Sequence, residues 1–365
     1  MSAKADFLRM KEEPDMETKF AVIDENNIDK EAIALAGQIL KDGGLVAFPT
    51  ETVYGLGGDA LNKESSRKIY EAKGRPSDNP LIVHIAEMDK LDKVVEKIPE
   101  SAKKLAEKYW PGPLTMILKK SQAVPMETTG GLQTVAVRMP NHPVALELIK
   151  AAGGYVAAPS ANTSGKPSPT LACYVKEDMD GRIDMILDGG QVGIGLESTI
   201  VDLTEEEPII LRPGYITKEM LEQTLGVSVA SDRTMMHGDC KEAPKAPGMK
   251  YRHYAPKGDL TIITGKEQDV VERINSLTKA MQEKGEKVGI IGTDETIAKY
   301  RADSVKSAGN RKEEETIARE LYRILREFDD EGITVIYSEG FAEDGIGQAI
   351  MNRLLKAAGH HVEKV

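Results

Sequence analysis

The chain has few cysteines, few aromatic side chains and no excess of positive charge. Only Cys173 and Cys240 are present, which excludes a disulfide framework or a cysteine-rich zinc cluster and indicates a reducing compartment. The formal net charge is −11, which argues against a protein that binds nucleic acid over its whole surface. A local basic cleft is still compatible with this charge.

Long hydrophobic runs are also missing. No apolar stretch approaches the length of a membrane span, and the charged N-terminal stretch has no apolar core of the kind found in secretory signals. We therefore expect a cytoplasmic protein with no membrane association, in which residues 1–20 form a mobile tail. The length of 365 residues, of which 40% are hydrophobic, predicts two globular domains.

Familiar catalytic and nucleotide-binding motifs are absent. There is no G-x-x-x-x-G-K-[ST] loop, no G-x-S-x-G and no H-E-x-x-H. The run Gly55 to Ala60 matches G-x-G-x-x-A, but Pro49 and a polar stretch separate it from the preceding strand, so we do not interpret it as a dinucleotide fingerprint.

The stretch from Gly43 to Ile85 carries the strongest signals. Residues 45–48 predict a buried strand that Pro49 ends, and a polar, glycine-rich segment follows at the strand end. Asn62 caps a helix that leads to Lys73-Gly74-Arg75-Pro76 and a stiff loop before the strand 81–85. Two cations on such a loop suit phosphate oxygens, although a solvated turn is the ordinary alternative.

Two later strands have polar residues that could face the same crevice. Arg138 interrupts the apolar strand 134–139, and it either points outward, pairs with a structural carboxylate or contacts a ligand. The strand 155–158 is followed by the polar loop Pro159 to Gly165. Open α/β sheets bind ligands at such strand ends, so both loops are candidates for one site.

The C-terminal part predicts a second, smaller domain. Strands at 260–264, 288–291 and 333–337 alternate with helices at 269–281, 313–328 and 347–358, as in a small parallel sheet. Regular periodicity is lost in the linker before it, whose segment Met249 to Tyr254 is rich in aromatic and cationic residues. His237 and Cys240 have a spacing that could serve a metal, but two residues are a weak signal.

Three motifs together resemble the YrdC-like family of threonylcarbamoyl-AMP synthases: PTETVYGLG, KGRPSDNPL and APSANTSG. The resemblance extends over the chain as in the long, two-domain members. It implies an α/β fold with a twisted open sheet domain of the YrdC type and a concave cationic cleft, followed by a small Rossmann-like parallel domain. The implied boundaries are a tail at 1–20, a catalytic domain at 21–228, a linker over the active site at 229–257 and the second domain at 258–365.

The same resemblance implies a nucleotidyltransferase, an L-threonylcarbamoyladenylate synthase. It would join L-threonine, bicarbonate or CO2, and ATP with Mg²⁺, and would release pyrophosphate. A separate transferase complex would then modify an adenosine beside the tRNA anticodon. Carried over by motif, the threonine site comprises Thr52, His84, Arg138, Ala158 and Ser198. The ATP site comprises Arg75, Asn79, Thr134, Ser160, Ser168, Arg212 and Tyr251, and the catalytic set comprises Lys73, Arg75, Ser160 and Asn162.

A binding module without catalysis is the alternative. The same cationic cleft could sense nucleotides or bind double-stranded RNA, and the family has been associated with RNA binding. The acidic net charge disfavours this alternative without excluding weak RNA binding.

Overall fold

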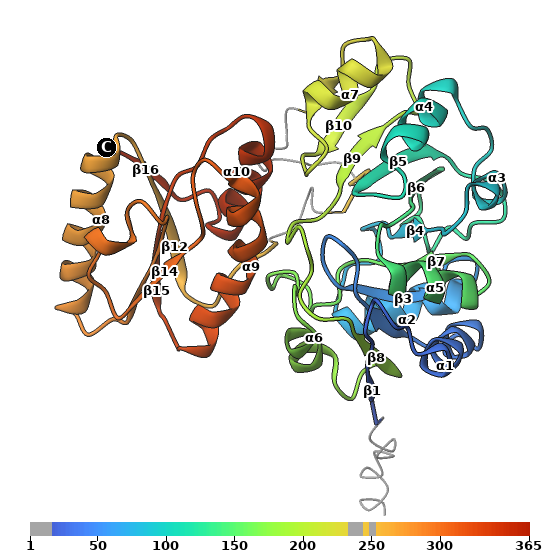
Figure 1. The fold of residues 1–365 in the computed structure, drawn as a ribbon, viewed down its shortest axis with the longest axis horizontal. Helices are drawn as coiled ribbons and strands as arrows, with labels where there is room; N and C mark the ends of the chain where they lie inside the picture. The colour runs from blue at the N-terminus through green and yellow to red at the C-terminus, as the bar shows by residue number, and fades with distance from the viewer. Residues whose placement is uncertain (1–16, 233–243, 248–252) are drawn as a thin grey trace, which may run out of the picture.

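The computed structural model describes residues 17–232, 244–247 and 253–365, which form two α/β domains (Figure 1). The first domain is built on a mixed sheet that has eleven strands within the described residues, in the order β1-β8-β2-β3-β7-β4-β6-β5-β9-β10-β11. These strands are β1 Lys19–Val22, β2 Val46–Phe48, β3 Gly55–Asp59, β4 Ile82–His84, β5 Leu114–Lys119, β6 Thr134–Arg138, β7 Val156–Ala157, β8 Met185–Asp188, β9 Thr199–Asp202, β10 Ile209–Arg212 and β11 Ala230–Ser231.

Alternating side chains of this sheet enter two separate cores. In β2, Val46 and Phe48 pack on one face with α1 (Lys30–Lys41) and α5 (Pro143–Ala151), while Ala47 enters the core on the other face. That second core receives apolar residues from α2 (Lys63–Lys73), α3 (Leu91–Val94), α4 (Glu100–Tyr109), α6 (Ala172–Met179) and α7 (Lys218–Leu225). Burial on both faces explains why the sequence of β2 is a continuous apolar run.

Capping residues set the starts of α1 and α2, and the cap predicted at Asn62 is confirmed. Asp29 accepts hydrogen bonds from the backbone N–H groups of Glu31 and Ala32, and Asn62 accepts one from Glu64. At the other end of α2, Gly74 has a φ of 59°, a left-handed conformation that glycine adopts without strain. This cap turns the chain from α2 directly into the loop of Arg75.

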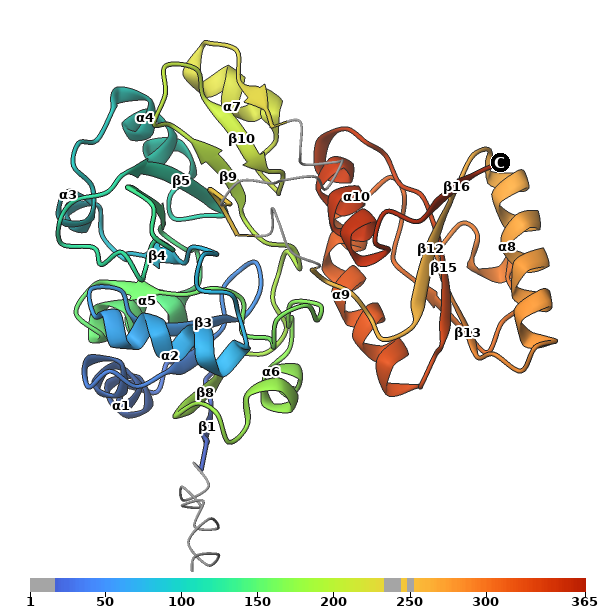
Figure 2. The ribbon, with the colours of Figure 1, turned by 180° about the vertical axis from the view of Figure 1, so that it is seen from behind.

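The C-terminal domain is a five-stranded parallel sheet in the order β14-β13-β15-β12-β16. Its strands are β12 Asp259–Thr264, β13 Val288–Gly292, β14 Ser304–Ser307, β15 Val335–Glu339 and β16 Val362–Lys364. The helix α8 (Glu267–Gln282) covers one face, while α9 (Glu314–Asp330) and α10 (Gly345–Ala357) lie between the sheet and the first domain (Figures 1 and 2). Both the mixed sheet domain and the small parallel domain confirm the predicted fold class.

Some elements depart from the sequence expectations. Lys19 and Phe20, assigned to the tail, belong to β1, which pairs in parallel with β8. The strand β11 lies within the expected linker and pairs with β10. The glycine-rich run after Pro49 contains a strand, β3, because the missing side chain at Gly57 leaves room for Val156 and Phe48. Residues 1–16 lie outside the described residues.

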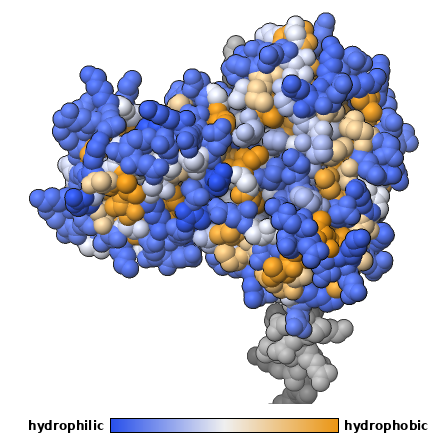
Figure 3. All heavy atoms as spheres, viewed as in Figure 1, coloured by the Kyte–Doolittle hydropathy of each residue, from blue (hydrophilic) through white to orange (hydrophobic). Residues whose placement is uncertain are grey.

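The two domains share an apolar interface. Val53 and Leu196 of the first domain belong to the same hydrophobic cluster as residues of α9 and α10. Outside this contact, the face of the molecule in Figure 3 is mostly hydrophilic over both domains, with scattered apolar patches. The described residues include no helix with the length and apolar character that crossing a membrane requires.

Candidate active site

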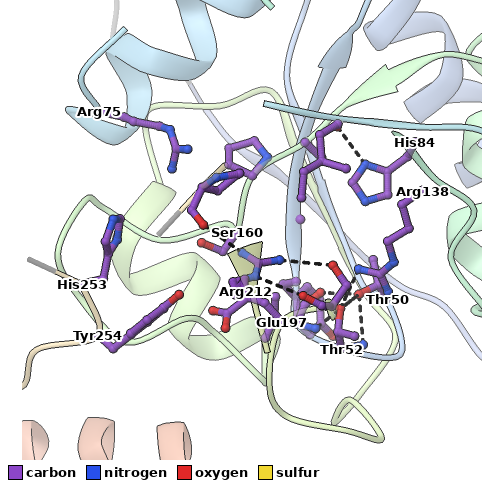
Figure 4. A pocket seen from close by; sticks show the side chains of 18 residues that line it. Thr50, Thr52, Arg75, His84, Arg138, Ser160, Glu197, Arg212, His253 and Tyr254 are labelled. Atoms are coloured by element: carbon purple, nitrogen blue, oxygen red, sulfur yellow. Dashed lines mark hydrogen bonds between the residues drawn. The ribbon is translucent and has the colours of Figure 1, made fainter. Parts of the chain in front are cut away.

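A buried pocket opens at the carboxyl ends of the parallel strands β4 and β6, where His84 and Arg138 are direct partners in register. It is shown in Figure 4 and has a volume of about 60 Å³. Three of its lining residues, Pro247, His253 and Tyr254, come from the segment between the two domains. Its lining comprises Thr50, Thr52, Val53, Tyr54, Gly55, Arg75, Ile82, His84, Arg138, Ala158, Pro159, Ser160, Glu197, Ser198, Arg212, Pro247, His253 and Tyr254.

All five residues predicted for the amino-acid site line this pocket, and Arg138 contacts three different residues there. Arg138 Nη1 donates to Thr52 Oγ1 at 2.9 Å, and its Nε donates to the Gly112 carbonyl at 3.3 Å. Its Nη2 lies 2.6 Å from Glu51 Oε2 as an ion pair, but neither atom has a hydrogen bond of good geometry. Arg138 is thus paired with a carboxylate and also faces the pocket.

His84 is a neutral imidazole in this site. Burial, followed by the charge of Arg138, lowers the pKa of His84 to about 3. Its Nδ1 lies 3.1 Å from the Ile82 carbonyl oxygen, which fixes the ring. Beside it, the backbone N–H of Ala158 donates to the same carbonyl at 2.9 Å, so Ala158 contributes only backbone and a methyl group to the pocket wall.

Ser198 and Arg212 form one hydrogen-bonded unit. Arg212 Nε donates to the Ser198 carbonyl at 3.0 Å and its Nη2 donates to Ser198 Oγ at 3.2 Å. Ser198 Oγ also lies 2.8 Å from Thr115 Oγ1 on β5. Burial lowers the pKa of Arg212, and nearby carboxylate and phenol groups oppose that shift. The predicted threonine and ATP residues therefore meet at this point.

Arg75 enters the pocket from the loop after α2. Its Nε donates to the Asn79 carbonyl at 3.2 Å and its Nη2 donates to the Pro80 carbonyl at 3.0 Å. Burial lowers the pKa of Arg75 to about 10, so the group stays cationic at neutral pH. Asn79 does not line the pocket, but it fixes the Arg75 side chain through its backbone, and its buried Oδ1 has no hydrogen-bond partner among the described residues.

Lys73 lies behind the pocket wall. It is buried, and its Nζ contacts the backbone carbonyls of Ser160 and Asn162. Ser160 Oγ donates to Asn162 Oδ1 at 2.6 Å, and the Asn162 amide donates to two carbonyls of its own loop. Of these three residues only Ser160 lines the pocket, so Lys73 and Asn162 hold the shape of the loop that presents it.

The other predicted ATP residues lie elsewhere. Ser168 Oγ donates to Glu197 Oε1 at 2.6 Å and therefore acts behind the pocket wall. Thr134 begins β6, roughly 13 Å along the strand from Arg138, and does not line the pocket. Tyr251, like His237 and Cys240, lies outside the described residues.

Sequence reasoning missed several residues of the site, among them two carboxylates and two aromatic residues of the segment between the domains. Glu51 pairs with Arg138, Glu197 lines the pocket, and His253 and Tyr254 close it from the linker side (Figure 4). The aromatic and cationic run of the linker was a signal for the last two. Nothing local in the sequence distinguishes the two carboxylates from the other acidic residues.

No cluster of three His, Cys, Asp or Glu side chains suitable for a metal ion occurs within the described ranges. The two carboxylates nearest the pocket are already engaged, Glu51 by Arg138 and Glu197 by cationic and hydroxyl donors. The described pocket therefore has the character of an anion site with three arginines, rather than a protein-built metal cage.

Fold and site together define a two-domain α/β protein with a buried, arginine-lined pocket at strand ends of its first domain. A family model described as "Telomere recombination" matches residues 38–214, and one described as "Threonylcarbamoyl-AMP synthase, C-terminal domain" matches residues 216–359. The chain therefore belongs to the threonylcarbamoyl-AMP synthase family, whose members are enzymes.

Three relatives show the extent of the similarity. The threonylcarbamoyl-AMP synthase of Bacillus subtilis is 50% identical over 342 residues, covering 93% of this chain and 97% of that protein. The crystal structure of Pyrococcus abyssi Sua5 complexed with L-threonine has a TM-score of 0.90 and 47% identity, covering 95% of this chain and 100% of that one. A shorter relative, the putative threonylcarbamoyl-AMP synthase of Mycobacterium tuberculosis, is 36% identical and covers only 53% of this chain.

Proposed function

We propose that this chain synthesises threonylcarbamoyl-AMP and pyrophosphate from L-threonine, bicarbonate or CO2, and ATP. The threonine amine forms a bond to the carbon of CO2 and loses a proton, which gives a carbamate. A carbamate oxygen then attacks the α-phosphorus of ATP, and the bond to the bridging oxygen breaks as pyrophosphate leaves. This step needs positioning and charge neutralisation rather than a covalent enzyme nucleophile.

The observation that carries the proposal is the meeting of two kinds of subsite in one pocket. Arg138, with Thr52 and neutral His84 beside it, is suited to the carboxylate and hydroxyl of a small amino acid. Arg75 and Arg212 line the same pocket and are suited to phosphate oxygens. The Pyrococcus abyssi relative was crystallised with L-threonine, and it is similar to this chain over nearly its whole length.

Each further residue has a proposed role. Ser198 is proposed to bridge the two subsites, because it lines the pocket and its Oγ accepts a hydrogen bond from Arg212 Nη2. Ser160 faces the phosphates, while Lys73 and Asn162 hold its loop through carbonyl and amide contacts. We propose Asn79, Thr134, Ser168 and Tyr251 as further parts of the ATP site, with Asn79 and Ser168 acting through the neighbours that they fix.

Mg²⁺ is proposed to enter with the triphosphate. Magnesium is commonly held by substrate phosphates and water with few protein ligands, which suits a pocket whose carboxylates are already paired. When bound, it would neutralise charge on the phosphate oxygens; the arginines of this chain orient the same oxygens from the protein side.

The pocket volume supports a step of opening before catalysis. About 60 Å³ is well below the roughly 300–1,000 Å³ of small-molecule sites, so ATP and threonine do not fit together in this arrangement. Pro247, His253 and Tyr254 belong to the segment between the domains, and we propose that they withdraw when ATP enters.

We also propose that the enzyme acts in the cytoplasm and passes its labile product to a tRNA-modifying transferase complex. Incubation of the chain with Mg-ATP, threonine and ¹³C-bicarbonate tests the activity. Mass spectrometry should detect a ¹³C-labelled threonine adenylate, together with threonine-dependent pyrophosphate release. Salt-sensitive binding of double-stranded RNA without any labelled adenylate would instead favour the non-catalytic binding module.

A further inference from the structure

Glu197 is an unexpected residue for a pocket that accepts a triphosphate. It is buried, lines the pocket and immediately precedes Ser198. A carboxylate at this place would repel phosphate oxygens, and it could also pair with Arg212 and neutralise it. Among the described residues Arg212 instead contacts Ser198 and the Pro247 carbonyl, with no ion pair to Glu197.

The Glu197 carboxylate is held from the C-terminal domain. Arg353 Nε on α10 donates to Glu197 Oε2 at 3.0 Å, and the Tyr322 hydroxyl on α9 lies 3.0 and 3.2 Å from the two carboxylate oxygens. From the first domain, Ser168 Oγ donates to Oε1 at 2.6 Å. Both carboxylate oxygens are therefore engaged by donors other than the pocket arginines.

Arg353 is itself fixed in place. It is completely buried, its Nη1 donates to the Pro213 carbonyl at 2.6 Å, and its Nη2 donates to the Glu197 carbonyl at 3.3 Å. Burial alone would raise the pKa of Glu197, but Arg353, Arg212 and the Ser168 hydroxyl outweigh burial and lower it to about 2. The carboxylate is therefore ionised at neutral pH and is neutralised mainly from the second domain.

We propose that Arg353 and Tyr322 are positioning residues of the active site: they hold the Glu197 carboxylate so that it does not form an ion pair with Arg212, whose charge then acts on the ATP phosphates. The proposal deepens the function proposed above and assigns the C-terminal domain a direct part in nucleotide binding. It predicts that loss of either donor weakens ATP binding much more than threonine binding, because only the phosphate subsite gains a competing negative charge.

Arg326 offers a matched control on the same interface. It is also buried, and it bonds Asp178 with both Nη atoms at 2.8 and 3.2 Å and the Pro167 carbonyl at 2.6 Å. None of these three residues lines the pocket. Arg326→Met therefore removes a comparable contact between the domains without exposing a carboxylate to the phosphate site.

The experiment uses the full chain with Arg353→Met, Arg326→Met, Glu197→Gln and the double variant Arg353→Met/Glu197→Gln. Calorimetry gives the Kd for Mg-ATP, kinetics give KM for each substrate, and thermal unfolding reports stability. We expect Arg353→Met to weaken Mg-ATP binding at least tenfold with less than threefold change in the threonine KM. Arg326→Met should lower the melting temperature but leave both constants within twofold.

Rescue by the double variant is the decisive result. Removal of the Glu197 charge should return Mg-ATP binding to within about threefold of the wild type, although the interface still lacks Arg353. A double variant that binds no better than Arg353→Met, or an Arg326→Met variant that is equally impaired in ATP binding, would overturn the proposal.

Tyr322→Phe covers the case in which Arg353→Met does not fold. It keeps the ring that stacks on Tyr254 at a centroid distance of 5.2 Å and removes only the hydroxyl. We expect a three- to tenfold weaker Kd for Mg-ATP that Glu197→Gln restores, and an unchanged Kd would contradict the proposal. Calorimetry needs no turnover, so a wild type that binds Mg-ATP without forming the labelled adenylate would refute the proposed function alone.

Discussion

Replacement of Arg138 tests the threonine subsite most directly. Arg138 contributes the charged group that we assign to the amino-acid carboxylate, and such charge-assisted hydrogen bonds contribute about 2–3 kcal/mol. Loss of that amount corresponds to roughly a 30- to 150-fold weaker affinity. We therefore expect the threonine KM of an Arg138 variant to rise by this factor, with the ATP KM changed less than threefold.

The ion pair with Glu51 dictates how the variant is made. Arg138 Nη2 lies 2.6 Å from Glu51 Oε2, and both side chains are largely buried. Removal of one partner from a buried pair costs about 3–5 kcal/mol because the other charge is left uncompensated. The double variant Arg138→Met/Glu51→Gln avoids this penalty, and comparison with Arg138→Met alone separates lost folding from lost binding.

The assay is pyrophosphate release at varied threonine and ATP, supported by calorimetric titration with threonine. Arg67→Met is the control, since that side chain is 54% exposed in its ion pairs with Glu64 and Glu127. Its effect on stability should stay within about 0.5 kcal/mol, with no change in either KM. Equal increases of the threonine and ATP KM in the folded Arg138 variants would refute the assignment of Arg138 to the carboxylate.

Three further predictions concern stability and domain organisation. The carboxylate of Glu197 has a pKa of about 2 in the folded chain, so its contribution is complete above about pH 4.5 and is lost as the pH falls towards 2, up to about 3 kcal/mol. The difference in the free energy of urea unfolding between wild type and Glu197→Gln should therefore be smaller at pH 3 than at pH 7. An equal difference at both pH values would contradict the assigned role of the Glu197 charge. A fragment of residues 17–232 should lose threonine-dependent pyrophosphate release, because it lacks the C-terminal donors to the pocket wall; unchanged turnover would exclude that dependence. Gly57→Ala should lower stability by about 1–3 kcal/mol, since the added Cβ would lie 2.9 Å from a Val156 methyl, whereas Gly193→Ala, with its nearest atom at 3.9 Å, should be close to neutral in thermal unfolding.

Much of the fold could be predicted because the signals are local. The cap Asn62 and the Lys73-Gly74 stop give the ends of α2, and the buried run of β2 ends at Pro49 as expected. In the C-terminal domain the alternation of strands and helices predicts a parallel sheet, and the structure has one. The buried face of a helix or strand is determined by apolar residues that are close together in the sequence, so their periodicity predicts it.

The missed elements depend on distant partners. The strand β3 has a glycine-rich sequence with little strand propensity, and it forms because β2 and β7 flank it and leave no room for side chains. The short strands β14 and β16 lie at the edges of the second sheet, where few buried residues mark them. Tertiary pairing decides these segments.

The residues of the site also fall into two groups, those that a local motif predicts and those that depend on a distant partner. Arg138, Arg75 and Arg212 could be chosen by motif, and the structure brings all three to one pocket. The importance of Glu197 could not be predicted, because its partner Arg353 is 156 residues away. A charge in a sequence does not show which opposite charge will reach it after folding.

The arrangement of Glu197 also bears on proteins that consist of the first domain alone. Such a chain has no α9 or α10 to supply a guanidinium and a phenol behind the pocket wall. An acidic residue at that position would then need a cation from another source, such as an inserted loop or a second subunit. Otherwise we expect an uncharged side chain there. The residue at the position of Glu197 should therefore differ between proteins that have the second domain and proteins that lack it.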